Sequence, residues 1–143
     1  MVTVRQLLER KDPALWSVEP DDPVLEVIQL MADHHIGALP VMRSGELLGI
    51  VSERDYARKV ALLGRSTTET PVWQIMSSPV ITVTREASVS DCMQLVTLNR
   101  VRHLPVMEGG QVVGMISIGD LVKAVIDEQQ HHIEDLERYI RSG

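Results

Sequence analysis

The sequence predicts an α+β fold made of two copies of one β-α-β-β-α unit, and three observations support this prediction. A shift of 65 positions places Leu39-Pro40-Val41-Met42 on Leu104-Pro105-Val106-Met107 without a gap. In both copies, apolar residues at helical spacing are followed by two short apolar runs. Each copy then closes with a serine and an aspartate three residues apart, Ser52 and Asp55 in the first and Ser117 and Asp120 in the second. A duplicated unit of this size normally packs against its copy, because half of the chain buries too little surface alone.

The first copy shows its elements in order. Residues 16–18 form a short extended stretch. A helix follows, since the next apolar residues recur every three or four positions and define one face: Val24, Val27, Ile28 and Met31. The apolar runs 38–42 and 47–51 are joined by a short link that contains Gly45, which predicts a β-hairpin. A second helix is expected after Ser52.

The second copy repeats this order. Its helical face consists of apolar residues at the same spacing: Val89, Cys92, Met93 and Val96. The runs 103–107 and 112–116 are joined through Gly109 and Gly110, which predicts a second hairpin. A last helix is expected after Ser117.

The repeats set the expected domain boundaries. We expect the first repeat with its lead-in at residues 1–63, a linker at 64–71, the second repeat at 72–126 and a helical tail at 127–143. The lead-in is expected to be helical around Val4 to Glu9. The tail carries apolar residues on one side (Ile133, Leu136 and Ile140, with Tyr139 beside them), which predicts packing on a second chain or on the module itself.

Composition and the pattern of apolar residues disfavour several classes of protein. The chain has 14 Lys+Arg against 20 Asp+Glu, a formal net charge of −6, which disfavours a general nucleic-acid binder. Aromatic content of 3%, with no Phe, disfavours base stacking on a platform of rings. No run approaches the roughly 18 apolar residues of a membrane span, and the N-terminus has no signal-peptide pattern. Together with the single cysteine, these features predict a cytoplasmic protein without membrane contact.

No arrangement of residues predicts catalysis. The adjacent pairs His34-His35 and His131-His132 point differently on a helix and cannot share a metal as i,i+4 neighbours can. Cys92 has no base near it in the sequence, and no glycine-rich phosphate loop is present. We therefore expect no enzyme activity, no catalytic cofactor and no metal site, and interpret Cys92 as a buried structural thiol.

The repeated frame resembles a pair of cystathionine β-synthase (CBS) domains, the Bateman module, over about residues 1–130. The residues that carry the resemblance are the apolar-Leu-Pro-Val strand, the glycine-containing turn, the Gly-apolar-apolar strand and the closing Ser-x-x-Asp, each present twice. The resemblance implies two repeats packed sheet to sheet about a pseudo-twofold axis. It also implies clefts that bind adenosine-containing ligands, and pairing of modules into a homodimer.

The resemblance assigns Asp55 and Asp120 as ribose ligands. A carboxylate at a helix start can accept hydrogen bonds from both ribose hydroxyls, and a charged acceptor makes them strong. The hydroxyls of Ser52 and Ser117, with the free helix amides, can meet ribose or phosphate oxygens. The alternative is that each Ser-x-x-Asp is a capping box that satisfies free amides at a helix start. The two roles can coexist.

The resemblance also implies an apolar wall for adenine. For the Asp120 cleft the matching residues are Trp16, Ile36 and Met115; for the Asp55 cleft they are Ile81, Val101 and Ile50. Ordinary core packing explains the same residues equally well. Trp16 either stacks on adenine or simply packs.

Phosphates need cations, and the two copies differ here. By resemblance, Arg102 and His103 reach phosphates, with Arg100 beside them, and Arg54 and Lys59 can add to this near Asp55. Solvated surface side chains are the alternative. The matching first-copy residues are His35, Gly37 and Ala38, so the clefts are expected to be unequal.

Two functions remain open. One is a regulatory sensor of AMP, ADP, ATP, NAD(H) or S-adenosylmethionine that signals to a separate partner protein, since no catalytic or transport domain is expected in this chain. The other is a scaffold or dimerisation module whose clefts hold no nucleotide.

Overall fold

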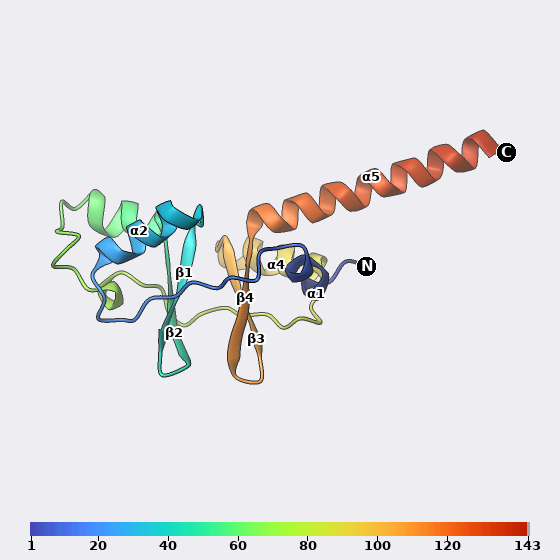
Figure 1. The fold of residues 1–143 in the computed structure, drawn as a ribbon. Helices are drawn as coiled ribbons and strands as arrows, with labels where there is room; N and C mark the ends of the chain where they lie inside the picture. Colours follow the sequence, from blue (N-terminus) through green and yellow to red (C-terminus); the bar gives the residue numbers. More distant parts are fainter. Residues whose placement is uncertain (143) are drawn as a thin grey trace. The chain divides into compact units, whose positions relative to one another are not determined.

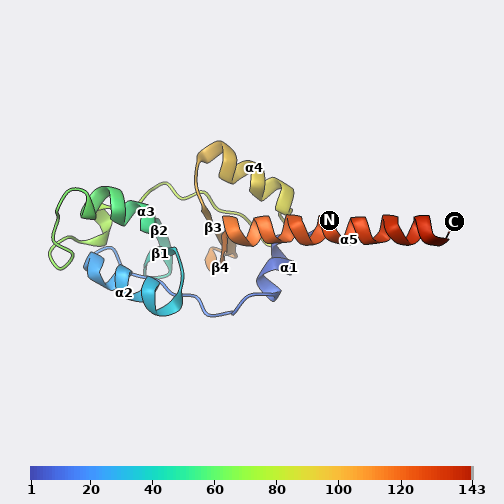
Figure 2. The ribbon, with the colours of Figure 1, turned by 90° about the horizontal axis from the view of Figure 1, so that it is seen from above.

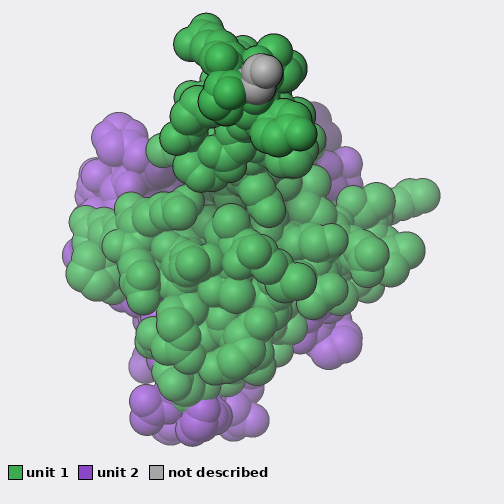
Figure 3. All heavy atoms as spheres, turned by 90° about the vertical axis from the view of Figure 1, so that its right-hand side faces the viewer, with its two compact units in different colours: residues 1–13, 82–108, 114–143 green, residues 14–81, 109–113 purple. Residues whose placement is uncertain are grey.

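The structure is a computed structural model that describes residues 1–142 and divides into two compact units (Figure 3). Unit 1 contains Met1–Pro13, Thr82–Glu108 and the chain from Gly114 onward. Unit 2 contains Ala14–Ile81 and Gly109–Val113. Each unit is described by itself below.

Unit 2 holds the helix and hairpin of the first repeat (Figure 1). Its elements, in chain order, are α2 (Val24–His34), β1 (Ala38–Arg43), β2 (Glu46–Ser52), α3 (Glu53–Tyr56), the π-helical turn η1 (Ala57–Ala61) and the 3₁₀ turn η2 (Val72–Gln74). The predicted apolar face of α2 is buried through Val24, Val27 and Met31, and Ile28 packs against the same core. The side chains of β1 and β2 that share this core include Leu39, Val41 and Val51, all fully buried.

Unit 1 holds the corresponding elements of the second repeat and the lead-in helix. They are α1 (Val4–Glu9), α4 (Val89–Asn99), β3 (His103–Glu108), β4 (Gln111–Ser117, of which Gly114 to Ser117 belong to this unit) and α5 (Ile118–Ser142). The lead-in helix has the predicted bounds, and the predicted tail is a continuation of α5. Residues 1–142 therefore form two small antiparallel sheets with helices, which confirms the α+β class.

The first strand of each repeat is shorter than the sequence suggests. Only Val18 bridges β1, through its N–H to Pro40 O (3.1 Å) and its carbonyl to Met42 N (2.8 Å). The next bond would need a backbone N–H at Pro40, which proline lacks. Val83 bridges β3 in the same way between Pro105 and Met107. The proline of the Leu-Pro motif therefore limits this pairing to one residue.

Two-residue turns close both hairpins. Ser44 and Gly45 have φ of 51° and 80°, and Gly109 and Gly110 have φ of 57° and 78°. Positive φ at both positions is the geometry whose twist matches the flanking antiparallel strands. The pairing of Arg43 with Glu46 across the first turn fixes the register at the end of that hairpin.

In each unit, the segment before the first extended stretch of one repeat packs on the hairpin of the other repeat. These segments, residues 1–15 and 72–77, are called the lead-in segments below. In unit 1, α1 begins with a hydrogen bond from Val4 N to Ala87 O, and Leu8 lies over Gly114 of β4. In unit 2, Ser77 and Ile50 exchange backbone hydrogen bonds of 2.8 and 3.0 Å, and Met76 lies over Gly49 of β2. Gly49 and Gly114 occupy matching positions of the repeat. In both units, a glycine on the hairpin leaves room for the lead-in segment that packs on it.

The C-terminal half of α5 has no support from the rest of unit 1. Every described residue from Ile126 to Ser142 is exposed. Figure 1 and Figure 2 show this part of the helix extending beyond the other elements of its unit.

Substitution of the two matching glycines tests this packing. A Cβ on Gly49 would lie 2.7 Å from Met76 Sδ and 3.1 Å from the Ser77 carbonyl, whereas a Cβ on Gly114 would meet only Leu8, at 2.6 Å. We expect Gly49→Ala to cost about 1–3 kcal/mol and Gly114→Ala less, because a side chain rotates away more easily than a backbone carbonyl. Thermal unfolding gives the comparison.

The matched control is Gly119→Ala, whose Cβ would meet Ser117 Oγ at an ordinary 3.6 Å. That variant should melt within a degree or two of the parent. Equal losses in all three variants would contradict the proposed close packing.

Candidate functional site

Both Ser-x-x-Asp motifs form reciprocal caps at helix starts. Ser52 N donates to Asp55 Oδ2 at 2.9 Å, and Asp55 N donates to Ser52 Oγ at 3.2 Å. Ser117 N donates to Asp120 Oδ2 at 2.8 Å, and Asp120 N donates to Ser117 Oγ at 3.1 Å. The capping interpretation is therefore confirmed for both pairs. It fixes both carboxylates at the start of a helix, where free backbone amides and the helix dipole favour negative charge.

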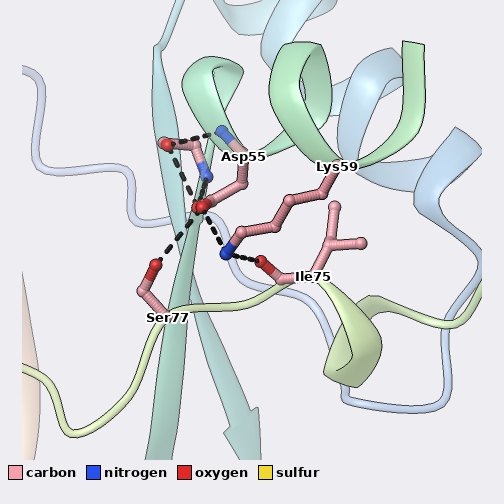
Figure 4. Close-up of polar contacts among 5 residues, drawn as sticks. Asp55, Lys59, Ile75 and Ser77 are labelled. Carbon is pink, nitrogen blue, oxygen red and sulfur yellow. Dashed lines mark hydrogen bonds and ion pairs between the residues drawn. The ribbon is translucent and has the colours of Figure 1, made fainter. Parts of the chain in front are cut away.

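The Asp55 carboxylate is enclosed by donors from its own unit (Figure 4). Lys59, on the π-helical turn η1, reaches back to Asp55 Oδ1 at 3.0 Å and donates to the Ile75 carbonyl at 2.9 Å. Ser77 Oγ donates to Asp55 Oδ1 at 3.2 Å. With Ser52 on the other oxygen, both carboxylate oxygens have partners, and the residue is only 7% exposed.

The Asp120 carboxylate is more open. Lys11 Nζ, from the lead-in, donates to Asp120 Oδ2 at 2.7 Å and to the Met115 carbonyl at 2.8 Å. Both donors to this carboxylate, Lys11 and Ser117, converge on Oδ2, and no hydrogen bond to Oδ1 is found among residues 1–142. The side chain of Asp120 is 25% exposed, against 10% for Asp55. Oδ1 of Asp120 is thus the freer acceptor of the two sites.

Each aspartate is bound by one lysine, and the two lysines come from different places in the repeat. Lys59 lies on the same helical segment as Asp55, and its counterpart in the second copy is the buried Ala124. Lys11 lies in the lead-in, and its counterpart is Met76. The sequence did not predict Lys11 at this site, because comparison of the two copies does not reveal it. The signal that was available is that the lead-in of one repeat packs on the other repeat, which brings lead-in residues such as Lys11 near the second Ser-x-x-Asp.

The lysine affects the titration of two neighbouring groups. Burial alone would raise the pKa of Asp120, but hydrogen bonds from Lys11 and Ser117 outweigh it and hold the pKa below its usual value. Burial, and then the charge of Lys11, lower the pKa of His103, although Asp120 acts in the opposite direction. The imidazole is therefore neutral near pH 7. The cationic charge beside Asp120 comes from Lys11 and not from His103.

The other predicted phosphate ligands lie on the surface. Arg102 is exposed, and its carbonyl accepts from Ile118 N at 2.8 Å, which holds its backbone beside the start of α5. Arg100 is exposed and ends α4 in a left-handed conformation with φ of 54°. Arg54 is exposed on α3, one residue before Asp55. Unit 1 thus brings Ser117, Asp120, Arg102, His103, Met115 and Lys11 together around one helix start.

The predicted adenine wall is made of half-buried side chains and the more exposed Trp16. Ile50 and Met115 lie on β2 and β4, directly before the capped helices, and Ile36 packs against the core of unit 2. Trp16 is 39% exposed and stacks on His34, with ring centroids 3.7 Å apart. One face of the indole is therefore covered by protein. The roles of Trp16, Ile36, Ile81 and Val101 in binding stay predictions, since each belongs to a cleft expected between the repeats.

The remaining reactive groups are a buried thiol and the potential metal ligands of residues 1–142. Cys92 is fully buried on α4, and burial together with Asp91 raises the pKa of its thiol. No cluster of three or more His, Cys, Asp or Glu side chains in the described part of the chain has metal-binding geometry. None of the described helices combines the length and apolar character needed to cross a membrane.

Comparison with known proteins identifies the repeats. The family model described as "CBS domain" matches residues 2–62 and again residues 72–127. The mitochondrial CBS domain-containing protein CBSX3 of Arabidopsis thaliana is 44% identical over 134 residues, which cover 90% of this chain and 65% of that protein. The CBS domain-containing protein YhcV of Bacillus subtilis is 33% identical over 105 residues, covering 73% of this chain and 74% of that protein. The chain thus spans just under two thirds of the plant relative.

Solved structures show the same fold. A candidate signal-transduction protein with CBS domains from Burkholderia ambifaria is 47% identical, with a TM-score of 0.85 over 90% of this chain and 96% of that one. A hexameric CBS-CP12 protein from bloom-forming cyanobacteria is 25% identical, with a TM-score of 0.76 over 85% of this chain and 70% of that one.

Replacement of Lys11 by methionine tests the electrostatics around Asp120. Because the ammonium lowers both values, the pKa of Asp120 and the pKa of His103 should both rise in Lys11→Met. In the parent, the stability that comes from ionised Asp120 is present above the ordinary aspartate pKa of about 3.9, and is lost as the pH falls through the lower pKa of the folded state. NMR titration of the carboxyl carbon and the imidazole ring measures both shifts.

The control is Arg10→Met, which removes an exposed cation one residue earlier. It should leave both titrations close to those of the parent. A fall in either pKa in Lys11→Met would show that another group controls this site.

Proposed function

The chain belongs to the CBS-domain family, whose members are generally regulatory, and we propose that it binds an adenosine-containing nucleotide at Asp120. The observation that carries the proposal is the state of that carboxylate. It is fixed at a helix start by Ser117, kept ionised by Lys11, and has one oxygen free of protein donors among residues 1–142. A sensor needs such a preformed and still accessible acceptor.

The chemistry of this carboxylate suits a ribose. The two hydroxyls of the ring are neighbouring donors, and a carboxylate can accept both through its two oxygens. Oδ1 accepts one hydroxyl directly, and the other replaces Lys11 at Oδ2. The exchange keeps the charge of Asp120 hydrogen-bonded, so the ligand does not leave a half-buried carboxylate without partners.

Displacement of Lys11 then gives the site its preference for phosphate. The released ammonium stays within a side-chain length of the ribose, where a 5′-phosphate offers it a new partner. Arg102 adds a second exposed cation next to the same helix start. His103, neutral near pH 7, can donate a hydrogen bond to the phosphate but adds no charge. These groups favour AMP, ADP, ATP or NAD(H) over adenosine.

The two sites are proposed to be unequal. Asp55 has donors on both oxygens and is nearly buried, so a ribose there has to displace Lys59 or Ser77 from a satisfied network. Ligand is therefore expected to occupy the Asp120 site first. Apolar residues of the other repeat, among them Trp16 and Ile36, are proposed to cover the adenine there. For the Asp55 site the proposed wall is Ile81, Val101 and Ile50.

The proposed biological role is regulation of a separate protein in response to the nucleotide, as in energy sensing. The domain division at residues 1–63, 64–71, 72–126 and 127–143, a homodimeric state and a cytoplasmic location are parts of this proposal. The Arabidopsis relative is named as a mitochondrial protein, so the cellular location of this chain has to be measured directly.

A scaffold without nucleotide is the second candidate function, and one observation favours it. The carboxylate of Asp55 is satisfied entirely within unit 2, as expected of a group whose role is to fix the helix start and the Ile75–Ser77 segment. If Asp120 has the same role, then neither site binds nucleotide.

Calorimetry with AMP, ADP, ATP, NADH and S-adenosylmethionine separates the two functions. We expect at least one phosphorylated ligand to bind the parent, and Asp120→Asn to weaken it by tenfold or more, because an amide loses the charge and one acceptor. Asp55→Asn should affect the tighter site little. Failure of the whole panel to bind a folded, nucleotide-free protein would favour the scaffold.

Asp91→Asn provides a matched control. Asp91 also lies three residues after a capping serine, Ser88, which accepts from Asp91 N at 3.0 Å. It lies in the first turn of α4 and is not assigned to either cleft, so its substitution should leave binding unchanged. Equal losses in Asp91→Asn and Asp120→Asn would point to a general effect on folding.

The proposed exchange at Lys11 predicts a change in ligand selectivity. In Lys11→Met the carboxylate no longer has a competing donor, but the phosphate loses a cation. The ratio of the AMP and adenosine affinities should therefore fall about tenfold or more, in line with a hydrogen bond to a charged group. Titration of both ligands into parent and variant gives the ratio. An unchanged ratio would show that Lys11 does not bind the phosphate. The role of Asp120 is tested separately by Asp120→Asn.

A further inference from the structure

The exposed half of α5 carries a regular heptad pattern. Isoleucines occur exactly seven residues apart, at Ile126, Ile133 and Ile140, and the positions between them hold Val122, Gln129 and Leu136. The spacing alternates four and three residues from Val122 to Ile140, which is the a/d pattern of a coiled coil with the isoleucines at a. This stripe is defined here as the heptad stripe: Val122, Ile126, Gln129, Ile133, Leu136 and Ile140.

The heptad stripe has no partner within the described chain. Its apolar side chains are between 43% and 74% exposed, and the helix that carries them is exposed on all sides after Val125. An isolated helical segment of this length is marginal in water unless an apolar face is buried. Exposed apolar residues that repeat at a fixed heptad spacing mark an interaction surface rather than scattered surface residues.

The opposite face of the helix carries polar side chains that form ion pairs and a hydrogen bond within the helix. Asp135 lies 2.9 Å from Arg138 and 3.8 Å from His131, and Gln130 donates to Glu134 at 3.4 Å. In the heptad, Glu134, Asp135, His131 and Arg138 fall at b, c and f, away from the a/d seam, and Gln130 falls at e beside it. The helix therefore has one solvated face and one face that is available to a partner.

We propose that the heptad stripe pairs with the same stripe of a second copy of this chain to form a parallel two-stranded coiled coil. β-branched residues at a, with leucine at d, favour two parallel strands. The three isoleucines at a fit this rule, and the d positions hold Val122, Gln129 and Leu136. In parallel register each Gln129 faces the Gln129 of the other copy, and the two amides can hydrogen-bond to each other. An antiparallel register sets each Gln129 against Ile133, where the amide has no such partner.

The residues that flank the seam fit the same pairing. His132 at g and Glu137 at e are five residues apart, the offset that brings g of one strand near e of the other in a parallel coiled coil. Their contact is attractive when the imidazole is protonated and is a neutral hydrogen bond otherwise. The pairing does not depend on nucleotide binding.

Cysteine cross-linking in the full chain tests the register directly. Gln129→Cys places a thiol in the seam, and mild oxidation should convert most of this protein into a disulfide-linked dimer. His131→Cys, two residues away on the outer face, should give no more dimer than the parent, whose Cys92 is fully buried. Addition of Ile133→Asp to Gln129→Cys should lower the yield at least fivefold, whereas addition of Glu134→Asp should not. Circular dichroism confirms that each variant is folded.

Two results would overturn the proposal. Equal cross-linking of Gln129→Cys and His131→Cys, or none in either, would mean that this face does not join two copies. Cross-linking only in a mixture of Gln129→Cys and Ile133→Cys proteins would mean an antiparallel pair.

Discussion

The close packing of each lead-in segment on the hairpin of the other repeat is the contact on which both candidate sites depend. Met76 packs over Gly49 in one unit, and Leu8 packs over Gly114 in the other. The first contact brings the Ile75 carbonyl and the Ser77 hydroxyl to Asp55. The second brings Lys11 to Asp120. Neither aspartate has its full set of neighbours from its own repeat alone.

These borrowed neighbours make the two sites differ although their capping boxes match. Asp55 receives donors on both oxygens and is nearly buried, so its charge serves the local fold. Asp120 receives both of its donors on one oxygen and stays a quarter exposed. A lysine that holds a carboxylate also protects it from the cost of burial while the site is empty. In the proposed binding, the same lysine competes with a ribose hydroxyl for Asp120.

Helix α5 connects the candidate site to the proposed dimer contact. Asp120 lies in its first turn, and the heptad stripe occupies its exposed half. A continuous helix is a stiff element of about 1.5 Å per residue, so a change at its start and a partner at its end act on one body. The candidate site and the proposed dimer contact are therefore parts of one helix.

The sequence alone determined the repeat, the α+β class, the hairpins, the lead-in helix and the helical tail. These follow from local spacing, from glycines at turn positions and from two matching motifs, all of which are properties of neighbouring residues. The capping role of Ser52 and Ser117 was also visible, because three residues separate each serine from its aspartate. The first strand was overestimated, since the effect of Pro40 and Pro105 appears only when the pairing partner is known.

Only the tertiary structure decided which cation lies at Asp120. Lys11 and Asp120 are more than 100 residues apart, and no spacing rule joins them. The sequence predicted unequal clefts from Arg102 and His103, but Lys11 aligns with Met76 and Lys59 with Ala124, so comparison of the two copies gave no guide to either lysine. The stacking of Trp16 on His34 and the neutral state of His103 have the same origin. Local pattern fixes helices and turns, whereas the charge and exposure of a site depend on residues that folding brings from elsewhere in the chain.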